Sequence, residues 1–372
     1  MWPKERMAFL VIHGIGEQNP FETLDSFVRN FLKTLKKNNN GSDIAVKHHV
    51  RTRTDNGKEW TENFISLVKS DQPECSIDFY EYYWAYKMEG EITFQELVEW
   101  LIKTSDGAGI FYNENKTLVK KYEGRSGDYW YLKHLGIIMR ALAFFRMLKI
   151  PYFDYVIPFI TPFLTKASQA FVDYMGDVAI YTTTDVKSKH YHVRNSILTD
   201  AVKDVKSLID NERYKNVIIA GHSLGSVIAY DTLNRVNHSL NLKPTEWQSA
   251  NKISGLVTFG SPLDKTAFFF REHTSDSQYV RRQILDHFHS FKGRALNLKG
   301  VGVKVEDPIM PLLDNQILWI NFWDAKDPVG GNLDFYVVDK NIQVNMKAKY
   351  GVAHNAYWEY EEMYKDICGY YF

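Results

Sequence analysis

A serine flanked by glycines stands at a spacing that suits nucleophilic chemistry. Ser223 is the middle residue of the pentapeptide Gly221-His222-Ser223-Leu224-Gly225. A hydroxyl group is a weak nucleophile at neutral pH, so it needs a neighbouring base, and the base needs an acid that fixes its tautomer. An activated serine here therefore requires a histidine and a carboxylate elsewhere in the chain.

The pentapeptide lies between a predicted strand and a predicted helix. Residues 217–220 form a short apolar, β-branched run, and residues 226–230 lack glycine and proline and can continue as a helix. A turn this sharp strains the serine backbone and leaves almost no room for the side chains of the residues beside it. Gly221 and Gly225 meet this requirement because they have no side chains. Ser223 would then stand at a helix N-terminus, where the Leu224 N–H can bind an oxyanion. An ordinary turn between a strand and a helix is the simpler alternative.

A second glycine-containing turn follows the first predicted strand. Residues 7–12 are apolar, and His13-Gly14-Ile15-Gly16 comes directly after them. Glycine after a core strand marks a place where the backbone comes close to another group. That group could be a substrate oxyanion, although an ordinary turn has the same composition.

Candidate acids and a candidate base follow Ser223 in the chain. Asp264, Asp324 and Asp327 each come after a predicted strand, and His354 lies in a predicted loop near the C-terminus. The carboxyl ends of parallel strands converge at one edge of a sheet, so these side chains can meet Ser223 there. His13 and His222 lie beside the serine but precede all three acids, and we interpret them as residues that shape the site.

Several motifs together resemble the α/β-hydrolase superfamily, in its serine lipase and esterase branch. The resemblance covers residues 7–85 and about 176–372. It rests on the type and order of five motifs: His13-Gly14, the Ser223 pentapeptide with Gly221, His222 and Gly225, the segment Phe259-Gly-Ser-Pro-Leu263, Asp327-Pro-Val329 and His354.

The resemblance implies a role for each of these residues. Ser223 would be the nucleophile, His354 the base and Asp327 the acid, with Asp324 and Asp264 left open as alternatives for the acid. Leu224 and Ile15 would supply the backbone N–H groups of the oxyanion hole. The early strands of many members are not evident before His13, which implies a minimal sheet.

Helical and strand patterns alternate through most of the chain, which predicts an α/β fold with a mostly parallel central sheet flanked by helices. The hydrolase core is predicted over residues 1–85 and 176–372, and a largely helical cap over residues 86–175. Asn19-Pro20 predicts the start of the first helix. A further helix is expected over residues 192–209, and residues 351–358 lead into a C-terminal helix that ends at Tyr364. Strands are expected over 7–12, 44–54, 77–84, 217–220, 253–259 and 317–323, with another strand or a hairpin within 335–348.

Composition narrows the range of partners. Lys+Arg and Asp+Glu both number 45, so no net field favours nucleic acid. Cys75 and Cys368 are far apart and form neither a disulfide framework nor a metal-ligand spacing, which fits a reducing, cytoplasmic compartment. No metal or organic cofactor is expected, no secretion signal is evident, and the oligomeric state stays open.

The sequence therefore predicts a serine hydrolase that cleaves carboxylic esters through an acyl-enzyme. Apolar and aromatic residues in the cap favour a lipid or other acyl ester over a small polar ester, and they leave peripheral membrane contact open. Acyl transfer and thioester cleavage would use the same residues. A non-catalytic, membrane-associated or protein-binding member of the fold is the alternative from another class.

Overall fold

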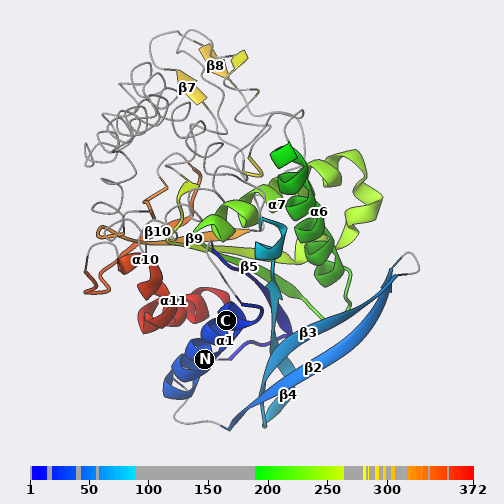
Figure 1. Cartoon of the computed structure of the whole chain (residues 1–372), viewed down its shortest axis with the longest axis vertical. Coiled ribbons are helices and arrows are strands. Elements are labelled where there is room, and N and C mark those ends of the chain that lie inside the picture. The colour runs from blue at the N-terminus through cyan, green and yellow to red at the C-terminus, as the bar shows by residue number, and fades with distance from the viewer. Residues whose placement is uncertain are drawn as a thin grey trace, which may run out of the picture.

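Strand β1 (Met7–Ile12) lies at the centre of an eight-stranded sheet with helices on both faces (Figure 1). The structure is a computed structural model. It describes residues 2–14, 19–38, 43–55, 58–88, 189–263, 280–281, 284, 290–292, 296–298, 303–305, 313, 317–327, 329–333, 336–349 and 352–372.

The described elements follow one another as strands, helices and short 3-10 helices. The other strands of the main sheet are β2 (Ile44–Asp55), β3 (Lys58–Lys69), β4 (Gln72–Tyr82), β5 (Asn216–His222), β6 (Ile253–Phe259), β9 (Leu318–Asp324) and β10 (Lys340–Val344). Strands β7 (Leu296–Leu298) and β8 (Val303–Val305) pair with each other. The helices are α1 (Glu22–Asn38), α6 (Lys189–Ile209), α7 (Leu224–Leu242), α10 (Ala353–Ala356) and α11 (Glu361–Tyr371), with 3-10 helices η1 (Ala85–Lys87), η2 (Pro244–Lys252) and η3 (Tyr357–Glu359).

The strand order places a topological switch beside the serine. The order across the sheet is β10-β9-β6-β5-β1-β4-β3-β2, and the six strands from β10 to β4 are parallel. Strand β4 pairs with one edge of β1, and β5, which comes later in the chain, pairs with the other edge. Ligands of open α/β sheets bind outside the carboxyl ends of the strands at such a switch. Ser223 directly follows β5 at this point.

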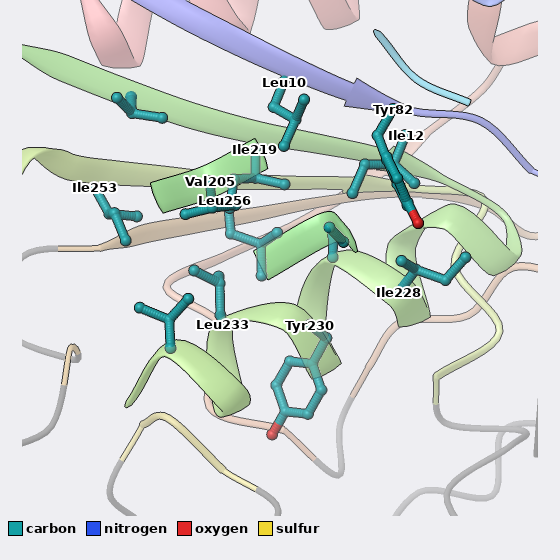
Figure 2. Close-up of a cluster of buried hydrophobic side chains, with 14 of the residues drawn as sticks. Leu10, Ile12, Tyr82, Val205, Ile219, Ile228, Tyr230, Leu233, Ile253 and Leu256 are labelled. Atoms are coloured by element: carbon teal, nitrogen blue, oxygen red, sulfur yellow. The ribbon is translucent and has the colours of Figure 1, made fainter. Parts of the chain in front are cut away.

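Alternate residues of β1 belong to two separate apolar clusters. Ala8, Leu10 and Ile12 pack in the cluster that includes α6 and α7, part of which Figure 2 shows. The intervening residues of the strand pack in the cluster that includes α1 and α11. Every residue of β1 is at most 1% exposed. This explains the uninterrupted apolar sequence, because a strand covered on both faces has no solvent side to make polar.

Most predicted elements are confirmed, and the mostly parallel sheet with helices on both faces agrees with the predicted fold class. The prediction of a minimal sheet is wrong, because the main sheet has eight strands. Strand β3, which the sequence did not predict, forms an antiparallel ribbon with β2 and joins it to β4. The C-terminal helix also continues past its predicted end at Tyr364 to Tyr371.

The first helix begins later than predicted, and a distant side chain caps it. Helix α1 starts at Glu22, so Pro20 precedes the helix instead of opening it. The Glu81 carboxylate, on β4, accepts hydrogen bonds from the Phe21 N–H (2.6 Å) and the Leu24 N–H (3.3 Å). A carboxylate at a helix N-terminus satisfies backbone donors that lack partners within the helix.

Some predictions fall outside the described residues. The predicted cap over 86–175 is described only at residues 86–88, and Ile15 and Asp264 are not described. The division into core and cap therefore stays a prediction. Across the described part of the chain, no helix combines the length and apolar character needed to cross a membrane.

Candidate active site

Close backbone packing holds Ser223 in a strained conformation. Its φ is 52° and its ψ is −128°, in a region that residues with side chains rarely adopt. A Cβ at Gly221 would lie 2.5 Å from the carbonyl oxygen of Gly225, and a Cβ at Gly225 would lie 2.3 Å from the carbonyl oxygens of Ile12 and His13. Gly225 is therefore required because α7 begins directly against the end of β1, and Gly221 because the end of β5 lies directly against the first turn of α7.

The turn after β1 passes beside the serine. A Cβ at Gly14 would lie 2.8 Å from the Cβ of Ser223. The close approach expected for this glycine is therefore an approach to the serine itself. Leu224, the other predicted oxyanion donor, is the first residue of α7, so its backbone N–H belongs to the first turn of that helix.

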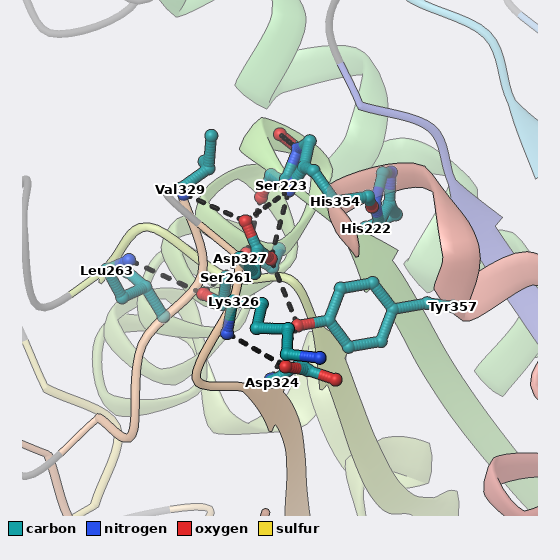
Figure 3. Close-up of polar contacts among 11 residues, drawn as sticks. His222, Ser223, Ser261, Leu263, Asp324, Lys326, Asp327, Val329, His354 and Tyr357 are labelled. Atoms are coloured by element: carbon teal, nitrogen blue, oxygen red, sulfur yellow. Dashed lines mark hydrogen bonds and ion pairs between the residues drawn. The ribbon is translucent and has the colours of Figure 1, made fainter. Parts of the chain in front are cut away.

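Three side chains that are distant in sequence form one hydrogen-bonded line (Figure 3). Nε2 of His354 lies 2.9 Å from Oγ of Ser223. Nδ1 of His354 lies 3.1 Å from each carboxylate oxygen of Asp327. Because a carboxylate accepts the Nδ1 proton, Nε2 of the neutral imidazole is left to accept the serine proton. The structure thus brings together the three residues that the sequence predicts as nucleophile, base and acid.

The Asp327 carboxylate is buried but well supplied with donors. Its side chain is 0% exposed, and the Val329 N–H donates to Oδ1 at 2.8 Å. Burial acts to raise the pKa of Asp327, but hydrogen bonding and charge interaction with His354, together with the Gly330 and Val329 N–H groups, hold it well below its ordinary value. Asp327 is therefore a carboxylate at neutral pH.

The competing acid on β9 has other partners. The Asp324 carboxylate accepts hydrogen bonds from the Lys326 N–H (2.8 Å) and the Met346 N–H (2.9 Å). Its oxygens therefore stabilise the turn after β9. Asp327, three residues later, is the carboxylate that meets His354.

His222 supports the short helix α10, which carries His354 where the sequence predicted a loop. Its Nε2–H donates to the backbone carbonyl of His354 at 2.8 Å. Burial, followed by the nearby His354, lowers the pKa of His222 to about 3. His222 is therefore neutral at physiological pH and acts on the site through this hydrogen bond.

His13 is fixed by Trp84, which the sequence analysis did not single out. The indole N–H of Trp84 donates to the His13 carbonyl (3.0 Å), and its backbone N–H donates to Nε2 of His13 (3.1 Å). The two rings stack with centroids 4.9 Å apart. Burial lowers the pKa of His13 to about 4, although its hydrogen bond to Gly14 opposes the shift. The imidazole is thus a neutral structural group at the end of β1.

Tyr357 is the second residue that the sequence analysis missed. Its hydroxyl donates to Oδ2 of Asp327 at 3.0 Å. A signal existed, because Tyr357 lies three residues after His354 and residues three apart share one face of a helical segment. The sequence could not reveal that this face meets Asp327.

A family comparison points to the same class of enzyme. The family described as Lipase (class 3) matches residues 160–287. The match covers about a third of the chain and includes the Ser223 pentapeptide. It supports membership of the α/β-hydrolase superfamily and suggests a serine lipase or esterase. No curated protein and no solved structure matches the chain. The described residues contain no group of three His, Cys, Asp or Glu side chains arranged to hold a metal ion.

Proposed function

We propose that this protein is a serine hydrolase that cleaves carboxylic esters, with Ser223 as nucleophile, His354 as base and Asp327 as acid. The hydrogen-bonded line from Ser223 through His354 to Asp327 carries the proposal. The strained turn that presents the serine supports it independently, because backbone strain of this kind is concentrated at functional sites.

The geometry suits a two-step acyl transfer. Oγ of Ser223 attacks the ester carbonyl carbon while Nε2 of His354 takes the hydroxyl proton. Asp327 stays ionised and stabilises the imidazolium. The imidazolium then gives its proton to the departing alkoxide, which leaves as the alcohol. In the second step His354 removes a proton from water, and the resulting attack releases the carboxylic acid and restores Ser223.

Backbone N–H groups would stabilise the oxyanion of each tetrahedral intermediate. We assign these donors to Leu224, at the start of α7, and to Ile15, after the turn at Gly14. One such donor is typically worth about 10²–10³ in rate. The close approach of Gly14 to Ser223 supports this placement of the second donor.

The substrate class that we propose is a lipid or other acyl ester. The match to a lipase family supports it, as does the apolar and aromatic composition of residues 86–175, the proposed cap. Lipid esters reside in membranes, so we propose that the enzyme contacts membrane surfaces peripherally, and the presence of only two cysteines supports a cytoplasmic location. Flotation with phosphatidylcholine liposomes tests this contact, and recovery of all protein in the bottom fraction would contradict it.

The nucleophile is tested with a fluorophosphonate probe followed by peptide mass spectrometry. We expect the adduct on Ser223 and loss of labelling in Ser223→Ala and His354→Ala. Ser207→Ala, which changes a partly buried serine on α6, is the matched control and should label like the wild type. p-Nitrophenyl esters of increasing chain length then rank the acyl preference. Folded wild-type protein that neither labels nor hydrolyses any ester, with or without detergent, would overturn the proposal and favour a non-catalytic role.

A further inference from the structure

Tyr357 occupies a buried position directly behind the acid of the proposed triad. The side chain is 0% exposed, and its ring packs near Phe259 with centroids 6.2 Å apart. Gly260 lies against the same ring, because a Cβ there would be 3.0 Å from Cε2 of Tyr357. The ring is therefore confined by its neighbours, and the position of its hydroxyl is defined.

The hydrogen bonds of this hydroxyl have one direction. The Asp324 backbone N–H donates to the Tyr357 oxygen at 2.9 Å. A backbone N–H can only donate, so the phenol must direct its own proton to another acceptor. That acceptor is Oδ2 of Asp327, 3.0 Å away. Burial, followed by the negative charge of Asp327, raises the pKa of Tyr357 well above its ordinary value, so the phenol keeps this proton.

The acid needs such a donor because bulk solvent does not reach its side chain. The side chain of Asp327 is fully buried, and a buried carboxylate depends on protein donors to remain ionised. The Val329 N–H binds Oδ1, while Tyr357 binds Oδ2 from a different element of the fold. The carboxylate is thus held from the loop after β9 and from the segment that carries His354.

We propose that Tyr357 is a positioning residue, whose hydroxyl holds the Asp327 carboxylate in the orientation that binds Nδ1 of His354. This inference rests on the proposed function, since it assumes that His354 is the base. The benefit is largest when His354 is protonated during turnover, because the carboxylate must then stay ionised and in place. Removing the hydroxyl should therefore lower kcat and leave KM nearly unchanged.

The test compares Tyr357→Phe with a matched control, Tyr364→Phe. Both tyrosines are fully buried, and the Tyr364 hydroxyl donates to the Trp358 carbonyl at 2.7 Å. Each variant thus removes one buried phenol hydroxyl while keeping the ring. With p-nitrophenyl butyrate we expect kcat of Tyr357→Phe to fall about tenfold, as for loss of a hydrogen bond to a charged group, with KM within about twofold. Tyr364→Phe should keep the wild-type kcat.

A double-mutant cycle separates positioning from a general structural effect. The rate constant for fluorophosphonate labelling is measured for Tyr357→Phe alone, Asp327→Asn alone and both together. If the hydroxyl acts through the carboxylate, adding Tyr357→Phe to Asp327→Asn should change the rate by no more than about twofold. A change of the same size in both backgrounds would overturn the inference, as would a Tyr357→Phe kcat within twofold of the wild type.

Failure of this inference is distinguishable from failure of the proposed function. If the chain is not a serine hydrolase, the wild type and Tyr364→Phe will neither label nor hydrolyse ester. If only the role of Tyr357 is wrong, both will be active, and Tyr357→Phe will match them or lose the same factor in the two backgrounds.

Discussion

The turn that carries Ser223 and the loop that carries Asp327 are both well defined, but by different forces. Around Ser223 the backbone of α7 packs so closely on β1 that only glycine fits at Gly225. Around Asp327 hydrogen bonds dominate, from neighbours in the loop and from His354 and Tyr357 on a later segment. Steric exclusion therefore places the proposed nucleophile, while directed donors place the proposed acid.

The difference determines how each region should fail. A hydrogen-bonded carboxylate can lose its charge while its volume stays the same, which should damage chemistry more than folding. A glycine in close backbone contact cannot accept even one methyl group without displacing main chain, which should damage folding directly. Substitutions in the two regions can therefore separate activity from stability.

The largest effect on activity is expected from Asp327→Asn. The amide cannot hold His354 in the required tautomer, so kcat should fall by about 10³–10⁴. Asp324→Asn is the matched control. The Asp324 carboxylate accepts hydrogen bonds from the Lys326 and Met346 backbone N–H groups, so kcat of this variant should stay within about tenfold of the wild type. Steady-state ester hydrolysis measures both. If Asp324→Asn lost more kcat than Asp327→Asn, the assignment of the acid would be reversed.

The largest effect on folding is expected from Gly225→Ala. The added methyl group would meet the backbone of Ile12 and His13 at 2.3 Å, so the free energy of unfolding should fall by about 3 kcal/mol or more. Gly369→Ala makes the same chemical change on α11, where nothing lies within 4 Å of the added Cβ, and should be neutral or stabilising by up to about 1 kcal/mol. Urea unfolding measures both. Equal stability of the two variants would contradict a steric requirement at the turn.

A change of pH tests the two regions without any substitution. The pKa values of His13 and His222 are about 4 and about 3 in the fold, against an ordinary value of 6.5. As pH falls below 6.5, the unfolded chain takes up these protons first. Stability should therefore decrease by about 1.4 kcal/mol per pH unit for each histidine until pH approaches 4.

Asp327 should respond in a lower range. Its pKa lies below the ordinary 3.8, so the stability it contributes is present above that value and is lost only as pH falls further. Urea-unfolding free energies between pH 7 and pH 3 cover the histidine range and the beginning of the Asp327 range. A constant free energy between pH 6.5 and pH 4.5 would show that the buried histidines do not contribute as described.

The sequence was most informative where local sterics decide the structure. The Ser223 turn needs a strand, two glycines and a helix in immediate succession, and all of them are adjacent in the chain. The two-sided burial of β1 likewise requires an uninterrupted apolar run, which is visible in residues 7–12. In both cases the physical requirement acts on neighbouring residues, so the pattern can be read without the fold.

The sequence was least informative where partners come from distant segments. Glu81 caps α1 from β4, about 60 residues away, and Tyr357 reaches Asp327 from η3. Strand β3 was missed for a related reason. Its residues from Lys58 to Asn63 pair with β2, whereas its pairing with β4 begins at Ile65, so the polar start of the strand carries no alternating apolar pattern.

The burial of β1 on both faces also bears on how the protein exchanges hydrogen with water. Alternate residues of the strand belong to both apolar clusters, and both of its edges pair with neighbouring strands, β4 and β5, so separation of one helical layer leaves its backbone hydrogen bonds in place. Its amide hydrogens should exchange only when the whole molecule unfolds. The scaffold beneath Ser223 therefore belongs to the slowest-exchanging part of the protein, and heat should abolish the proposed activity no later than it exposes the amides of β1.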